Sequence, residues 1–275
     1  MLDAIFWDIN PEIFHFGPFS VRWYGLLYAM GFLVAITLLG KIFKHEGAPE
    51  DWLDKVFIYI ILAVIVGARL GHCCFYEWDY YSAHPLEILQ IWKGGLASHG
   101  GALMMLVAVW FLSKFMTKLS FWWLGDRLFV VSALVACLIR CGNLMNSEIY
   151  GPPTDLPWGF IFARGDEYPG QACHPTQIYE GLAYITLFFV LLWLYWKRDF
   201  GRYNGLLSGI GFTWVFTARF FIEFIKNDQV VREANMTLNI GQMLSLPFIA
   251  FGIFLIIRAL KKGEIEYKMP KQVKK

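Results

Sequence analysis

Seven runs of about twenty mostly apolar residues alternate with short polar connections along the chain. They lie near residues 20–40, 56–76, 95–112, 122–142, 177–196, 205–225 and 240–260. A helix needs about twenty apolar residues to cross the ~30 Å hydrocarbon core of a bilayer. The pattern therefore predicts an all-α polytopic membrane protein with seven transmembrane helices, forming a single integral domain over residues 1–275.

Basic residues are unevenly divided between the two sides that seven spans create. Fifteen of the 24 lysines and arginines flank one side, five lie on the other, and four fall within spans. Cytoplasmic loops carry the excess of lysine and arginine. This division predicts an N-terminus outside and a C-terminus in the cytoplasm. The basic tail over 261–275 is then cytoplasmic, close to anionic lipid head groups.

Composition supports a membrane location and excludes several other functions. The chain is 57% hydrophobic, and its net charge of +2 is too small to indicate a nucleic-acid partner. Its five cysteines form no C-x-x-C pair, and no H-E-x-x-H sequence or phosphate-binding glycine loop occurs. We therefore expect neither a metal nor an organic cofactor.

Polar side chains gather at the span ends that this topology places outside. An arginine at the centre of a membrane helix costs ~2.5–3.5 kcal/mol, so several at one depth predict a cavity lined by protein or water and open to the outer face. The long outer loop over 147–173 is rich in proline, glycine and acidic residues, which predicts an extracytoplasmic cap over that cavity. The polar layer comprises Tyr24, Arg69, His72, His99, Arg140, Asn143, Asn146, Glu148, His174, Gln177, Glu180, Arg219 and Glu223.

The arginines of this layer suit an anionic ligand. A guanidinium presents a planar fork of donors that matches phosphate, so Arg140 and Arg219 are candidates for a phosphate clamp. The alternative is that Arg219 pairs with Glu223, and Arg140 with Glu148 or Glu180, only to brace helices. His99, among the glycines of GGLASHGG, is either a hydrogen-bonded core residue or a base, at a tightly packed or re-entrant start of the third span.

The stretch RCGNLMNSEIYG, from Arg140 to Gly151, resembles the signature of the bacterial prolipoprotein diacylglyceryl transferase family. Its fixed positions match Arg140, Gly142, Asn143, Asn146, Glu148 and Gly151, whereas Ile139 and Leu144 replace a glycine and a phenylalanine. Further landmarks of the family follow in order along nearly the whole chain: VRWYGLLYAMGF, GARLG, GGLASHGG, HPTQIYEG and ARFFIEF.

This resemblance implies transfer of the sn-1,2-diacylglyceryl group of phosphatidylglycerol to the lipobox cysteine in the signal peptide of a preprolipoprotein. It implies a multi-pass protein of the bacterial cytoplasmic (inner) membrane, surrounded by membrane lipids, with its active site toward the extracytoplasmic face. The catalytic residues would be His99, Arg140 and Arg219. The substrate-binding residues would be Tyr24, Arg69, Asn143, Asn146, Glu148, Gly151, Gln177, Glu180 and Glu223.

A transporter or flippase for an anionic lipid or small anion is the alternative function. It would also place arginines midway across a helical bundle. However, the polar layer is confined to the outer half of the spans, and no inverted repeat is visible. These two features favour the transferase.

Overall fold

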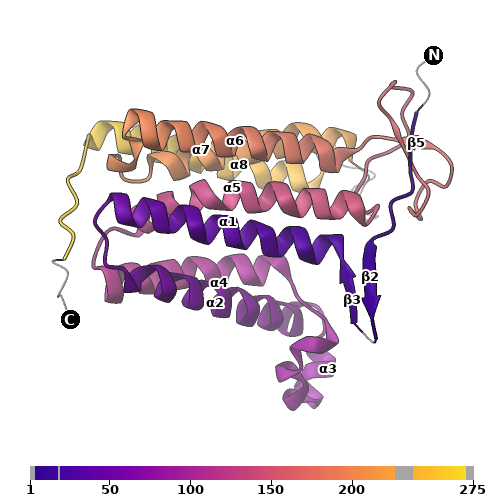
Figure 1. The fold of residues 1–275 in the computed structure, drawn as a ribbon, viewed down its shortest axis with the longest axis horizontal. Coiled ribbons are helices and arrows are strands. Elements are labelled where there is room, and N and C mark those ends of the chain that lie inside the picture. Colours follow the sequence, from indigo (N-terminus) through magenta and orange to yellow (C-terminus); the bar gives the residue numbers. More distant parts are fainter. Residues whose placement is uncertain (1–3, 18, 227–237, 271–275) are drawn as a thin grey trace. The chain divides into compact units, whose positions relative to one another are not determined.

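The structure is a computed structural model that describes residues 4–17, 19–226 and 238–270. Seven helices in these ranges are long and apolar enough to cross a membrane (Figure 1), which confirms the predicted fold class. Their bounds are α1 Trp23–His45, α2 Asp51–Phe75, α4 Ser98–Phe111, α5 Phe121–Met145, α6 Thr176–Arg198, α7 Leu206–Ile222 and α8 Ile240–Lys262. Helix α4 continues through a π-helical turn, Leu112–Thr117, and α7 through a 3-10 turn, Glu223–Ile225.

Short elements that the sequence did not predict lie between the long helices. Strand β1 (Ile5–Trp7) pairs in parallel with β4 (Phe160–Phe162), which pairs antiparallel with β5 (Ala172–Cys173). Strands β2 (Glu12–Phe16) and β3 (Phe19–Arg22) form an antiparallel pair. Helix α3 (Trp78–Ala83) and the 3-10 turns Pro85–Leu89, Ile91–Lys93 and Phe200–Arg202 complete the fold. Strands of two to five residues are too short to leave a periodic pattern.

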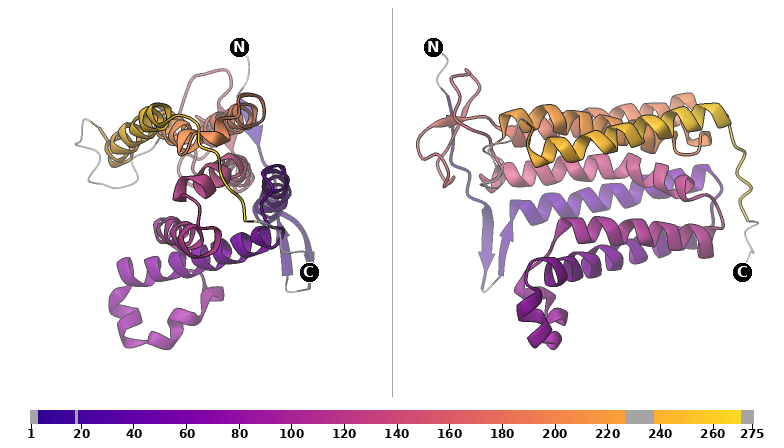
Figure 2. Two further views of the ribbon diagram at one scale, coloured as in Figure 1. Left: turned by 90° about the vertical axis from the view of Figure 1, so that its left-hand side faces the viewer. Right: turned by 180° about the vertical axis from the view of Figure 1, so that it is seen from behind.

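The chain divides into two compact units, which are described separately. The first contains residues 1–38 and 126–266, and the second contains 39–125 and 267–275. In the first unit, α6, α7 and α8 run alongside one another (Figures 1 and 2). Helices α7 and α8 touch through glycines, because a Cβ on Gly209 would lie 2.9 Å from the Gly252 carbonyl oxygen. This close contact packs the beginning of α7 against the middle of α8.

Asp126 anchors one end of the first unit. Its carboxylate is fully buried and accepts hydrogen bonds from the backbone N–H groups of Gly205 and Ser208, each at 2.8 Å, and from the Ser208 hydroxyl at 2.7 Å. These N–H groups belong to the first turn of α7, which has no carbonyl partners for them within the helix. Asp126 therefore caps the start of α7 from a neighbouring helix, and the Ser208 hydroxyl is one of the donors to this cap.

The loop over 147–173 is folded around a small core of its own. Tyr150, Phe160, Phe162 and Cys173 are buried together, and the Tyr150 and Phe162 rings stack with centroids 4.5 Å apart. Burial raises the pKa of Tyr150 and of Cys173. The loop is attached to α5 by Trp7 of β1, whose indole Nε1 donates to the Leu144 carbonyl at 3.0 Å. The loop is thus ordered beside the end of α5, while its action as a cap stays a prediction.

In the second unit, α2 and α4 pack closely through glycines. A Cβ on Gly71 would lie 2.8 Å from the Gly100 Cα, and one on Gly67 would lie 2.5 Å from the Gly100 carbonyl oxygen. The turn before α4 uses Gly94 and Gly95 at φ of 87° and 71°, which side chains other than glycine rarely adopt. Of the two forms that the sequence allowed for GGLASHGG, the structure has the tightly packed helix start.

Candidate active site

The family signature folds into a connected chain of polar side chains at the end of α5. Arg140 Nη1 donates to Asn143 Oδ1 at 3.0 Å, and Asn143 Nδ2 donates to Glu148 Oε1 at 2.8 Å. Asn146 Nδ2 reaches the same Glu148 oxygen at 3.2 Å. Arg140 and Asn143 are neighbours because residues three apart share a helix face. Asn143 therefore connects Arg140 to Glu148, and Asn146 helps to hold the Glu148 carboxylate.

The turn that brings Glu148 back toward Asn143 is held by the start of α6. Ser147 and Ile149 adopt left-handed backbone angles, with φ of 52° and 59°. Gln177 Nε2 donates to the Glu148 carbonyl at 2.6 Å, and the Thr176 hydroxyl donates to the Ile149 carbonyl at 2.8 Å. Both side chains are buried. In this structure Gln177 supports the backbone of the signature turn.

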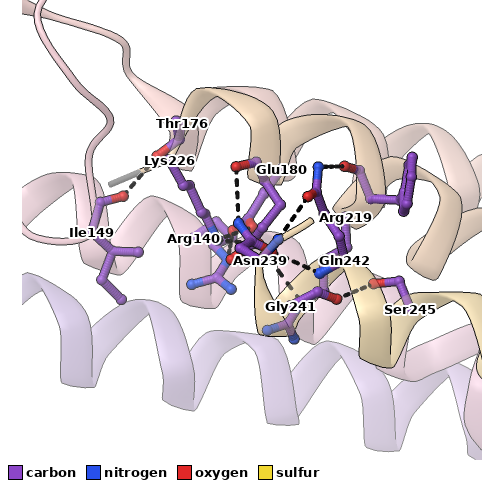
Figure 3. Close-up of polar contacts among 12 residues, drawn as sticks. Arg140, Ile149, Thr176, Glu180, Arg219, Lys226, Asn239, Gly241, Gln242 and Ser245 are labelled. Atoms are coloured by element: carbon purple, nitrogen blue, oxygen red, sulfur yellow. Dashed lines mark hydrogen bonds and ion pairs between the residues drawn. The ribbon is translucent and has the colours of Figure 1, made fainter. Parts of the chain in front are cut away.

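Five charged side chains from α5, α6 and the end of α7 meet beside this turn (Figure 3). Arg140 Nε forms an ion pair with Glu180. Lys226 Nζ lies 2.6 Å from Glu180 Oε1 and 3.9 Å from Glu223 Oε2. Arg219 Nε also lies 3.9 Å from Glu223 Oε2. We call these five residues the charge cluster.

Both helix-bracing pairs that the sequence suggested occur, but the pair with Glu223 leaves donors of Arg219 available. The Arg219 side chain is 42% exposed, and 3.9 Å is too long for a hydrogen bond to Glu223. Within the described residues, Arg219 Nε has no hydrogen-bond acceptor. A guanidinium carries five N–H donors, so Arg219 can still bind an oxyanion. The structure is therefore compatible with a phosphate clamp as well as with bracing.

Glu223 lies against the first turn of α8. A Cβ on Gly241 would lie 2.6 Å from Glu223 Oε1, so only glycine leaves room for the carboxylate there. Asn239 forms a capping box with Gln242 at this helix start, and Asn239 Nδ2 donates to the Glu223 carbonyl at 3.3 Å. The N-terminus of a helix favours negative charge. The start of α8 therefore stabilises the Glu223 carboxylate in the charge cluster.

Two glycines of the signature are close-approach positions. A Cβ on Gly142 would lie 2.7 Å from Tyr24 Cδ2, so the Tyr24 ring packs directly on α5. A Cβ on Gly151 would clash with the Ile225 carbonyl oxygen, one residue before Lys226. Gly142 thus places Tyr24 beside the Arg140 turn, and Gly151 places the segment that carries Lys226.

His174 supports the same region from the loop. Its carbonyl accepts from the Gly151 N–H at 2.8 Å, its N–H donates to the Pro152 carbonyl at 3.1 Å, and Nδ1 lies 3.3 Å from the Tyr179 hydroxyl. Burial lowers the pKa of His174 below its usual range. The imidazole is therefore held preferentially in its neutral form.

Arg69 and His99 belong to the second unit. Arg69 is 3% exposed and donates to the backbone carbonyls of Glu87, Ile88 and Gly94 at 2.6–2.9 Å. Its guanidinium therefore ties the segment between α2 and α4 to α2. His99 is the second residue of α4. The roles of Arg69 and His99 toward a substrate stay predictions.

Lys226 is the residue of the cluster that the sequence did not identify as part of the site. On sequence it is one of the five basic residues assigned to the outer side of the membrane, with no distinguishing motif. Its spacing of i, i+3 from Glu223 was the available signal. The second contact, to Glu180 on α6, exists only in the folded chain.

Comparison with known proteins gives a consistent result. The family model of prolipoprotein diacylglyceryl transferase matches residues 11–258. A phosphatidylglycerol-prolipoprotein diacylglyceryl transferase of Chloroherpeton thalassium is 48% identical over 95% of this chain and 97% of its own length. Relatives of the same name from Porphyromonas gingivalis and Tolumonas auensis are 46% and 44% identical, each over 94% of this chain and over 95% and 98% of their own lengths. The chain therefore belongs to the prolipoprotein diacylglyceryl transferase family.

Proposed function

We propose that this protein is an integral membrane enzyme that transfers the sn-1,2-diacylglyceryl group of phosphatidylglycerol to a cysteine thiol of a preprolipoprotein. The observation that carries the proposal is the charge cluster, in which Arg140 and Arg219 from two helices meet beside the family's signature turn. Fixed cations in a membrane helix are expensive. Binding of an anionic lipid head group explains why two arginines lie here, which bracing of helices alone does not.

The reaction is a substitution at the sn-3 carbon of the diacylglycerol. The cysteine sulfur forms the new C–S bond while the C–O bond to the phosphate breaks, and the bonding electrons leave with glycerol phosphate. The thiolate is the nucleophile, so the thiol must lose its proton to a base or to the departing phosphate. Negative charge builds on the phosphate as the bond breaks. A site that stabilises this charge accelerates the step.

The residues divide between these two tasks. Arg140 and Arg219 bind the phosphate and stabilise its developing charge. Asn143 and Glu148 hold Arg140 in place, since they form the hydrogen-bonded chain that begins at its guanidinium. Tyr24 packs beside them and contacts the lipid head group. His99 accepts the thiol proton or orients the thiol.

The substrate peptide is the signal peptide of a preprolipoprotein, with the thiol in its lipobox. The protein lies in the bacterial inner membrane with the site toward the extracytoplasmic face, N-terminus outside and C-terminus inside. The uneven division of basic residues supports this orientation. The loop over 147–173 then covers the site from outside.

The decisive experiment incubates the purified protein with phosphatidylglycerol and a lipobox peptide. We expect a thioether lipopeptide and glycerol phosphate in equal amounts, and no product from a peptide with serine in place of cysteine. Losing a charge-assisted contact at a developing anion costs ~10²–10³ in rate. Because lysine lacks the fork, Arg140→Lys and Arg219→Lys should be impaired to that extent. Movement of phosphatidylglycerol between leaflets without any lipopeptide would favour the flippase and refute the transferase.

A further inference from the structure

Lys226 is a buried cation placed between two buried carboxylates. Its side chain is 7% exposed, and those of Glu180 and Glu223 are 2% and 5% exposed. Nζ lies 2.6 Å from Glu180 Oε1 and 3.9 Å from Glu223 Oε2. Each carboxylate also faces an arginine of the clamp. Lys226 is thus the shared partner of both acids.

Lys226 determines the net charge of the cluster. Arg140, Arg219 and Lys226 contribute three positive charges, and Glu180 and Glu223 contribute two negative ones. Glu148 stands apart, because it is exposed and its carboxylate accepts from two amides rather than from a cation. Without Lys226, the two acids would balance the two arginines. With it, one positive charge is left for a ligand, and the phosphodiester of phosphatidylglycerol carries one negative charge.

Local packing holds Lys226 at this position. The Ile225 carbonyl lies directly against Gly151, and the Lys226 N–H donates to the Glu223 carbonyl at 3.4 Å. The Glu223 carbonyl also accepts from Asn239, the N-cap of α8. The backbone before Lys226 is therefore tied to the signature turn and to the start of α8.

We propose that Lys226 is a positioning residue that neutralises Glu180 and Glu223, so that Arg140 and Arg219 keep their charge for the phosphate of an anionic lipid. The proposal rests on the proposed function and adds to it the source of the clamp's net charge. Lys226 acts through the acids and does not itself touch the phosphate.

The test compares one single variant, Lys226→Met, with two double variants in which the wild-type net charge of the cluster is restored. Lys226→Met leaves two cations facing two acids, whereas Lys226→Met combined with Glu180→Gln, or with Glu223→Gln, restores one excess cation. Binding of phosphatidylglycerol in nanodiscs of graded lipid composition is measured first, with uncharged diacylglycerol as the control lipid. We expect Lys226→Met to lose on the order of 10²-fold in affinity for phosphatidylglycerol, since one charge of a buried network is removed. Affinity for diacylglycerol should not change.

Three further results decide the proposal. Both double variants should regain at least tenfold in phosphatidylglycerol affinity over Lys226→Met, and Lys226→Arg should bind nearly as the wild type does. If Lys226→Met fails to fold, the two double variants and Lys226→Arg carry the same test against the wild type. Wild-type affinity in Lys226→Met, or no phosphatidylglycerol binding in both double variants, would overturn the role. Failure of the proposed function is seen separately, as wild-type protein that binds the lipid but makes no lipopeptide.

Discussion

Replacing Gly151 with alanine should disrupt the site although no polar group is lost. The new methyl group would clash with the Ile225 carbonyl and would lie 2.9 Å from Thr176 Cγ2 and 3.0 Å from His174 Cβ. Ordinary contacts between such atoms are about 3.5–4.0 Å. Gly151 has no left-handed backbone angle, so the effect comes from space alone. At least one of the three neighbours must move by roughly half an ångström or more.

The size of the effect follows from what those neighbours hold. Overpacking of this kind costs about 1–3 kcal/mol of stability, which a membrane bundle of seven helices tolerates. Thr176 supports the signature turn, and Ile225 precedes Lys226. A displacement of about 1 Å in a catalytic site can cost on the order of 10²-fold in rate. We therefore expect a folded Gly151→Ala protein with about a hundredth of the wild-type transfer rate.

Gly181→Ala is the matched control. Gly181 follows Glu180 on α6, and a Cβ there would meet only Arg140 Cβ at 3.8 Å, an ordinary van der Waals contact. Alanine in a helix interior is also more favourable than glycine by roughly 0.5–1 kcal/mol. The assay is lipopeptide formation from phosphatidylglycerol and a fluorescent lipobox peptide, with thermal unfolding measured in the same detergent. Wild-type rates in Gly151→Ala, or an equal loss in Gly181→Ala, would refute the packing argument.

Three further expectations concern stability and orientation. Asp126→Asn keeps the shape of the α7 cap but replaces a charged hydrogen-bond acceptor with a neutral one. The free energy of unfolding, measured in graded detergent mixtures, should fall by on the order of 3 kcal/mol. An unchanged unfolding midpoint would exclude the cap. Because the folded-state pKa of His174 is lowered, the stability linked to it is complete above about pH 6.5 and is lost as the pH falls through the folded pKa. The melting temperature should therefore fall more between pH 7.5 and pH 5.5 in the wild type than in His174→Gln, and parallel curves would contradict this. A cysteine placed at Lys271 should resist membrane-impermeant labelling of intact cells, and rapid labelling would reverse the proposed topology.

The seven spans could be predicted from the sequence because their signal is strong and local. A continuous run of about twenty apolar residues has one arrangement of low free energy in a bilayer. This is a helix, because it pairs all of its backbone N–H and C=O groups within the segment. The observed helices differ from the predicted runs by a few residues at their ends, where the first span gives way to the β2–β3 pair and the third continues in a π-helical turn. Strand β1 escaped prediction because its partner β4 is distant in the sequence. Strands β2 and β3 are neighbours in the sequence, but they are too short to leave a periodic pattern.

The sequence also identified Arg140, Glu180, Arg219 and Glu223, since polar residues inside apolar spans stand out by their cost. It left open whether Arg140 faces Glu148 or Glu180, and it did not assign Lys226 to the site. The partner of Arg140 depends on the contact between α5 and α6. The place of Lys226 depends on the contact between α6 and the segment after α7, since Lys226 and Glu180 are 46 residues apart. The local sequence pattern shows only that each charged residue is costly in an apolar span. Which of the three cations pairs with which of the two acids is decided only when separate helices pack together.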